Sequence, residues 1–181
     1  MKLKIILSVL LSSVTLWSSA MEVGGIRLPT RQDDFKLQGA GLLRKGFIFK
    51  IYVGALYLQS DEHADQVLGA VPKRLDIHYF HQTPKKHMIR VAEQTLKKNL
   101  SDEEYIKLLP MIGKLHDAYL DGQKGSVASL IYKPGEGLAY AFDDRVVTTI
   151  PNDEFANAYF KIWLGEDPSS RSIKEAMLKG G

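Results

Sequence analysis

An arginine and a tyrosine in one long apolar stretch are the first residues of this sequence that could do chemistry together. The odd-numbered positions of residues 47–57 are all apolar or aromatic, which is the two-residue period of a strand with one buried face. Arg44 shares its parity with Lys50 and Tyr52, so if the pairing holds across the intervening glycine we expect these three side chains on one, less apolar face. A guanidinium and a phenol there could line a cleft. The alternative is that Arg44 pairs with a surface carboxylate at the end of a hairpin.

Several common kinds of active site are absent from the sequence. It contains no Walker loop, no paired-glycine dinucleotide fingerprint, no Gly-x-Ser-x-Gly elbow and no cysteine. His78, His81 and His87 lie close together in the sequence, but His78 and His81 would face opposite sides of a strand. Zinc sites usually need several well-placed ligands. We therefore expect hydrogen-bonded or solvated histidines, with no metal and no cofactor.

The elements that must position these residues follow from hydrophobic periodicity. Residues 21–29 are predicted to form a short strand or the start of a hairpin. Further strands are predicted at 35–39, 47–57, 74–80, 126–133, 138–142 and 146–150, and the first two of these form one hairpin. Helices are predicted at 61–69, 84–100, 101–121, 151–165 and 172–178. Strands, then a helical layer, then strands and helices again indicate one α+β domain.

The helix predicted at 84–100 has a face that is less apolar than a pure core face. Thr83 is its expected N-cap and Pro84 its first residue. Its inward face is predicted to carry Met88, Val91, Ala92, Thr95, Leu96 and Asn99. The next helix should begin at Ser101, which can form a capping box with Glu104.

The first twenty residues predict a secretory signal peptide. Lys2 and Lys4 precede an apolar run, and the segment ends in small residues before an expected cleavage after Ala20. A spanning helix needs about 20 predominantly apolar residues, so this run is too short, although an uncleaved anchor is the alternative. No later stretch qualifies as a membrane span. We expect an exported, periplasmic protein whose mature part, residues 21–181, is a single domain.

Composition excludes two further classes of protein. The chain has 181 residues, of which 45% are hydrophobic and 25% charged, so it can build a core and is not disordered. Loss of Lys2 and Lys4 leaves 22 of the 24 basic residues against 21 acidic ones. A nearly neutral mature chain lacks the concentrated positive charge of a general nucleic-acid binder. We expect no nucleic-acid partner.

Three stretches of the chain resemble the chalcone isomerase-like family, in its exported bacterial branch. They are Gly39–Arg44, Phe49–Leu58 and Ile150–Gly165. The resemblance covers nearly the whole mature chain and agrees with the predicted order of strands and helices. It implies an open-faced β-sandwich of chalcone isomerase type, in which an antiparallel sheet is covered by a helical layer with an apolar ligand cleft between them.

The resemblance also implies which residues surround that cleft. The plant enzymes of the family cyclise a chalcone to a flavanone without a cofactor, using an arginine and a threonine from a hairpin and a tyrosine and an asparagine from the next helix. By position these fall on Arg44, on Tyr52, on or beside Met88, and on or near Thr95. The helix at 84–100 contains no tyrosine. Loss of such polar donors removes transition-state stabilisation, so efficient chalcone cyclisation is not expected.

The fatty-acid-binding relatives are the better guide, because there an arginine and a tyrosine hold the carboxylate of a lipid. A guanidinium and a phenol are suited to that task. We therefore expect a non-catalytic protein that binds a small amphipathic ligand, such as a fatty acid or aromatic acid, near Arg44, Tyr52, Met88 and Thr95. One alternative is a cofactor-independent isomerase, an intramolecular lyase, with Arg44 as electrophilic stabiliser and Tyr52 as proton donor. Another is a structural protein in which Met88 and Tyr52 fill the cleft.

Overall fold

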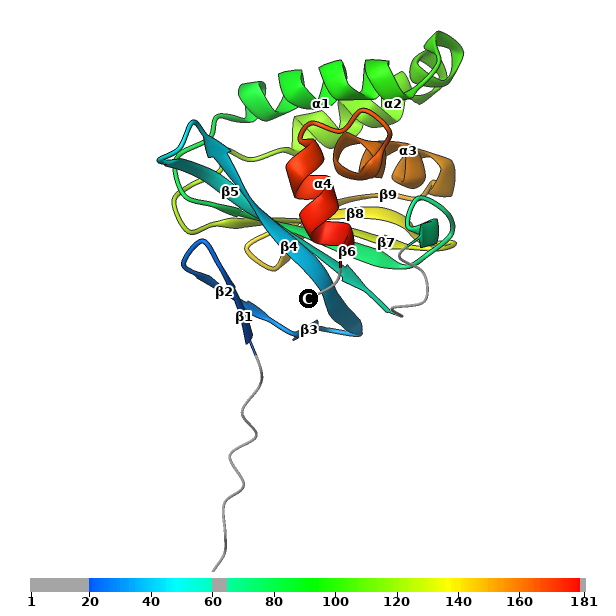
Figure 1. Cartoon of the computed structure of the whole chain (residues 1–181). Coiled ribbons are helices and arrows are strands. Elements are labelled where there is room, and N and C mark those ends of the chain that lie inside the picture. Colours follow the sequence, from blue (N-terminus) through cyan, green and yellow to red (C-terminus); the bar gives the residue numbers. More distant parts are fainter. Residues whose placement is uncertain (1–19, 60–64, 180–181) are drawn as a thin grey trace, which may run out of the picture.

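The computed structural model describes residues 20–59 and 65–179, which form a seven-stranded antiparallel sheet, a short hairpin and four helices. The predicted signal peptide, and residues 61–64 of the predicted helix at 61–69, lie outside the described residues; residues 65–69 form a short turn. The strands of the large sheet follow one another in chain order from β3 to β9. Figure 1 shows the helices on one face of the sheet and the β1–β2 hairpin on the other. The predicted α+β fold, an antiparallel sheet under a helical layer, is confirmed.

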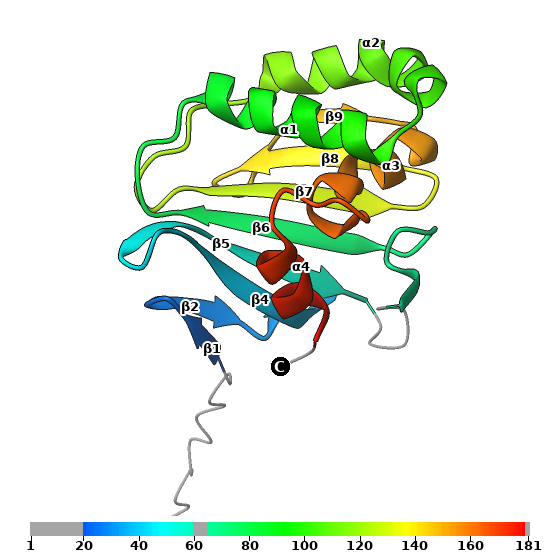
Figure 2. The same ribbon diagram turned by 45° about the horizontal axis from the view of Figure 1, so that its top comes forward.

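The bounds of the elements agree with most of the predicted ranges. The strands are β1 (Ala20–Val23), β2 (Ile26–Pro29), β3 (Arg31–Gln32), β4 (Phe35–Lys45), β5 (Phe49–Leu58), β6 (Lys73–Tyr79), β7 (Val127–Lys133), β8 (Gly137–Phe142) and β9 (Arg145–Ile150). The helices are α1 (Lys85–Asn99), α2 (Asp102–Ala118), α3 (Asp153–Leu164) and α4 (Arg171–Leu178). Figure 2 shows α1 and α2 side by side above the far strands, with α4 against β4.

Apolar side chains cover both faces of the sheet. On the face toward the helices, which we call the inner face, Leu56 and Leu75 are fully buried with Leu96 of α1 and Phe155 of α3. On the outer face, the side chains of Val53, Ala55 and Tyr57 are buried under the β1–β2 hairpin and pack with Leu28 and Phe35. From Val53 to Leu58, strand β5 therefore carries no polar or charged residue apart from the phenol of Tyr57, as expected of a strand buried on both sides.

A buried ion-pair network fixes the outer face. Arg74 is 4% exposed, and its Nε donates to Asp76 Oδ1 at 2.7 Å. Its other nitrogens lie 3.1 Å from Asp33 Oδ2, 3.2 Å from Ser129 Oγ and 3.4 Å from Asp144 Oδ1. Because buried charges are tolerated only when they are paired, this network ties strands β6 and β7 to two loops.

One of the two predicted helix caps is confirmed. Ser101 accepts from the Glu104 N–H while Glu104 accepts from the Ser101 N–H, which is the expected capping box. The predicted cap at Thr83 is wrong, because α1 begins one residue later, after Pro84, and the Thr83 hydroxyl donates to the His81 carbonyl at 3.3 Å. Within the described ranges, no helix has the length and apolar character needed to cross a membrane.

Candidate ligand-binding cavity

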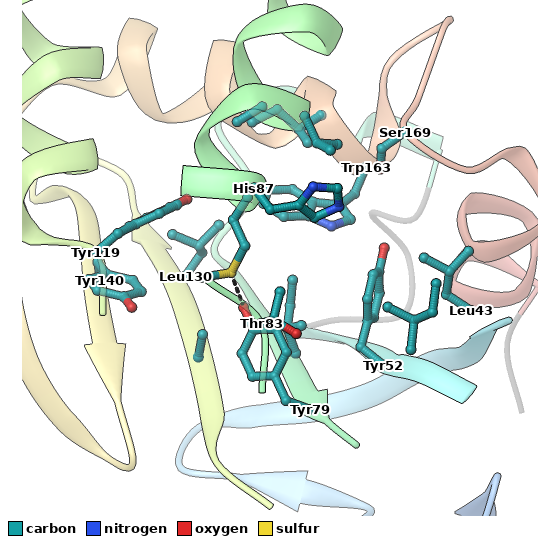
Figure 3. A pocket seen from close by; sticks show the side chains of 17 residues that line it. Leu43, Tyr52, Tyr79, Thr83, His87, Tyr119, Leu130, Tyr140, Trp163 and Ser169 are labelled. Atoms are coloured by element: carbon teal, nitrogen blue, oxygen red, sulfur yellow. Dashed lines mark hydrogen bonds between the residues drawn. The ribbon is translucent and has the colours of Figure 1, made fainter. Parts of the chain in front are cut away.

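A cavity of about 250 Å³ lies between the inner face of the sheet and helices α1 and α3. This is close to the lower end of the volumes typical of small-molecule sites, about 300–1,000 Å³. Figure 3 shows the lining side chains converging from both layers. The wall is formed by Leu43, Ile51, Tyr52, Ile77, Tyr79, Thr83, His87, Met88, Val91, Ala92, Tyr119, Ala128, Leu130, Tyr140, Ile162, Trp163 and Ser169. None of these is a charged residue, so the described wall is mostly apolar with hydroxyl and ring N–H groups.

A β-bulge decides which hairpin side chains reach the cavity. Leu43 pairs with Tyr52 and the next residue, Arg44, pairs with Lys50, so Ile51 is an extra residue on β5. A bulge re-aims neighbouring side chains, and both Ile51 and Tyr52 line the cavity here. Lys50 is therefore on the outer face, where its Nζ donates to the Gly24 carbonyl at 2.7 Å.

The predicted common face for Arg44, Lys50 and Tyr52 is therefore wrong. That prediction assumed an unbroken two-residue period, whereas the structure has a turn at residues 46–48 and a bulge after it. Arg44 follows the cavity residue Leu43 on β4, points away from the cavity with its partner Lys50, and is exposed. The same turn leaves Phe47 99% exposed at the hairpin tip instead of in the predicted buried face.

Two of the four predicted site residues, Tyr52 and Met88, line the cavity. The other two, Arg44 and Thr95, are not among the lining residues. Thr95 is buried within α1, where its hydroxyl donates to the Val91 carbonyl at 2.8 Å. The role of all four in ligand binding stays a prediction.

Met88 is held in place by a tyrosine from the sheet. The Tyr79 hydroxyl donates to Met88 Sδ at 2.8 Å, as the dashed line in Figure 3 marks. Tyr79 lies directly across the ladder from Tyr52. Burial raises the pKa of Tyr79 well above its usual value, so this phenol keeps its proton at neutral pH. The thioether and the phenol thus form a neutral part of the wall.

The phenol of Tyr52 belongs to a polar corner of the cavity. Burial raises the pKa of Tyr52 to about 12, and the Ser169 hydroxyl and the Trp163 indole partly oppose this shift. Figure 3 shows the Tyr52 hydroxyl directed toward Trp163 and Ser169. We call Tyr52, Trp163 and Ser169 the polar corner. At neutral pH it offers only uncharged O–H and N–H groups, which can donate to an anionic or polar ligand group.

An arginine of α1 that is hydrogen-bonded to a histidine of the cavity wall brings positive charge close to the cavity. His87 lines the cavity, and Arg90 Nη2 lies 2.7 Å from its Nδ1. A guanidinium only donates, so Nδ1 must accept and the ring proton must sit on Nε2. His87 and Ser169 are the exposed members of the lining set, so they mark the cavity mouth. Arg90, also exposed, lies just outside it.

A chain of buried hydrogen bonds closes the far end of the cavity. The Tyr119 hydroxyl lies 2.6 Å from that of Tyr159, which in turn lies 3.0 Å from His116 Nε2. Burial raises the pKa of Tyr119 well above its usual value and lowers that of His116. The three groups therefore stay neutral near pH 7 and satisfy one another without a ligand.

Most of the polar groups on this wall were not predicted from the sequence, namely Tyr79, His87, Tyr119, Tyr140, Trp163 and Ser169. One signal was available for Tyr79, because it falls on the same alternating face as Leu75 and Ile77. No sequence signal pointed to His87, because its role in the site depends on its hydrogen bond to Arg90, one turn later in α1. Among the described residues, no group of three or more His, Asp or Glu side chains is arranged to hold a metal ion.

An antiparallel sheet covered on one face by helices, with an apolar cavity between the layers, defines an open-faced β-sandwich. The model of the chalcone isomerase-like family matches residues 20–179, so the chain belongs to that family. A crystal structure of a fatty-acid binding protein from Arabidopsis thaliana has the same fold, with a TM-score of 0.70 at 15% identity, covering 88% of this chain and 96% of that chain. A search of curated protein sequences gave no significant match.

Proposed function

We propose that this protein is an exported, non-catalytic binding protein that holds a small amphipathic acid, such as a fatty acid or an aromatic acid, in the cavity. The observation that carries the proposal is the cavity itself, about 250 Å³ of largely apolar space with uncharged donors near its mouth. The related fold of a fatty-acid binding protein supports the choice of ligand class. The signal peptide predicted at residues 1–20 supports export to the periplasm and membership of the exported bacterial branch.

The charge distribution favours one orientation of such a ligand. Burying an apolar tail in a cavity without charged residues costs no desolvation energy. A carboxylate buried there would lose its hydration and gain no counter-ion. The polar corner can donate to the carboxylate, and the His87–Arg90 pair adds a further N–H and a nearby positive charge. We therefore place the carboxylate at the mouth and the tail toward Ala92 and Leu130. Arg44 and Thr95 lie outside the wall, and we assign them no contact with the ligand.

Native mass spectrometry of protein purified from the exported fraction tests this proposal. We expect a retained acid, together with an intact mass that corresponds to residues 21–181. Ala92→Phe, which pushes a ring into the cavity from α1, should abolish retention. Tyr52→Phe should weaken it about tenfold or more, since a hydrogen bond to a charged group contributes about 1.5–3 kcal/mol.

Tyr57→Phe is the matched control. Tyr57 lies on the outer face, and its buried hydroxyl has no hydrogen-bond partner among the described residues, so its removal should leave retention unchanged. Retention that survives Ala92→Phe would contradict the proposal, as would the absence of any bound or titratable acid. Cyclisation of a hydroxychalcone that is lost in Tyr52→Phe would assign the isomerase function instead.

A further inference from the structure

The tip of the β4–β5 hairpin exposes apolar side chains that the fold leaves uncovered. Phe47 is 99% exposed, Ile48 89% and Phe49 53%. Such contiguous exposed apolar side chains mark sites of interaction with another molecule or a membrane. We call these three residues the hairpin tip. In Figures 1 and 2 the hairpin reaches the edge of the molecule beside the connection that leads into α1.

Exposed basic residues gather near the hairpin tip, and one exposed carboxylate, that of Asp121, accepts from the Lys85 N–H at 2.7 Å. Arg44 and Lys45 precede it on β4, and Lys85 and Lys86 begin α1 close by, all four being exposed. The two segments are in contact, because the ring of Phe49 stacks on that of His81 with centroids 4.4 Å apart. Residues 39–58 and 77–92 contain no aspartate or glutamate. We call Arg44, Lys45, Lys85 and Lys86 the basic rim. The apolar hairpin tip within this rim is complementary to a surface that has an anionic outer layer over an apolar interior.

We propose that the hairpin tip inserts into the surface of an anionic phospholipid bilayer. Three side chains on a projecting turn bury far less area than the roughly 1,200–2,000 Å² of a stable protein–protein interface. They suffice for shallow insertion into a bilayer, where apolar burial adds to attraction between the basic rim and lipid phosphates. The strands that carry the tip also supply Leu43, Ile51 and Tyr52 to the cavity wall. Docking would thus bring this part of the cavity wall toward the lipid surface, although the inference does not depend on the ligand proposed above.

Flotation of the purified exported protein with vesicles tests the inference. Vesicles of phosphatidylcholine with phosphatidylglycerol should carry the protein with them, and those of phosphatidylcholine alone should carry much less. Added salt should weaken the binding. Phe47→Ser combined with Ile48→Ser should reduce partitioning at least about tenfold, because each side chain contributes an apolar burial energy. Arg44→Gln combined with Lys45→Gln should reduce it about fivefold per charge, and only on the anionic vesicles.

Ile106→Ser combined with Leu109→Ser is the matched control. These exposed apolar residues lie on α2, 65% and 44% exposed, and their loss should leave vesicle binding unchanged. Phe47→Trp gives an independent readout, since its emission should shift to the blue and be quenched by brominated lipid. Three results would overturn the inference: no binding to anionic vesicles, binding that survives the tip substitutions, or self-association that those substitutions abolish. The last would make a second copy of the chain the occupant of the tip.

Discussion

Lys73 should make the stability of this protein rise with pH above neutrality. The side chain is fully buried between β6 and α3, and its Nζ donates to the carbonyls of Gly69 and Val71 at 2.9 and 3.1 Å and to Asn157 Oδ1 at 3.0 Å. The ring of Tyr132 lies 4.4 Å away. These groups suit an ammonium ion, but burial outweighs them and lowers the pKa of Lys73 to about 7.

The sign follows from counting protons. Between pH 7 and about pH 9.5 the unfolded chain keeps the proton, because its lysine pKa is near 10.5, while the folded protein releases it. The unfolded state then binds more protons, so the free energy of unfolding rises with pH by about 1.4 kcal/mol per unit at most. Integrated over this range with the partial titration at its two ends, the gain is about 3 kcal/mol.

Urea denaturation of the wild type and of Lys73→Met across this pH range measures the effect. We expect the free energy of unfolding of the wild type to gain about 3 kcal/mol relative to the variant. Lys107→Met serves as the control, because Lys107 is 60% exposed and should leave the pH slope unchanged. Parallel pH profiles for the wild type and Lys73→Met would refute the reasoning and show that the acceptors and rings keep Lys73 charged.

Two further substitutions test the scaffold of the cavity. Ser101→Ala removes the capping box at the start of α2, where the Ser101 hydroxyl accepts from the Glu104 N–H, and should lower the free energy of unfolding by about 1 kcal/mol in urea denaturation. Arg74→Met leaves the Asp76 carboxylate buried without its partner and should cost about 3–5 kcal/mol, measured in the same way. A loss below about 1 kcal/mol would mean that Asp76 is solvated or paired elsewhere.

The sequence predicted most of the fold because most elements bury one clear face. The three strands at 127–150 and helix α3 lie within a few residues of their predicted ranges, since each combines a regular apolar period with a turn or cap at its ends. The hairpin was predicted less well because Phe47 and Phe49 continue the apolar period through a turn. Whether such side chains are covered depends on the layer above them, which a local pattern does not contain.

The candidate site was harder to predict than the fold for a related reason. Odd or even position in the sequence predicts the face of a side chain only while a strand pairs without interruption. One inserted residue moves all the residues on its far side to the opposite face. Here the extra residue, Ile51, separates Tyr52 from the two cations that share its parity. The positive charge nearest to the cavity wall therefore comes from another element, helix α1. There the Arg90 guanidinium is hydrogen-bonded to His87, which lines the cavity.

This separation of charge from cavity links the two proposals. A strict two-residue period would have carried Lys50 to the inner face with Tyr52, where burial of its ammonium without a partner would cost several kcal/mol. Because of the bulge, the Tyr52 phenol lies on the inner face while Lys50 lies on the outer face and donates to the Gly24 carbonyl. Arg44 is exposed at the surface. The hairpin is thus uncharged where Leu43, Ile51 and Tyr52 line the cavity, and its cations lie outside the cavity. That arrangement suits both proposals, because the cavity can take up an apolar tail while the basic rim binds an anionic surface.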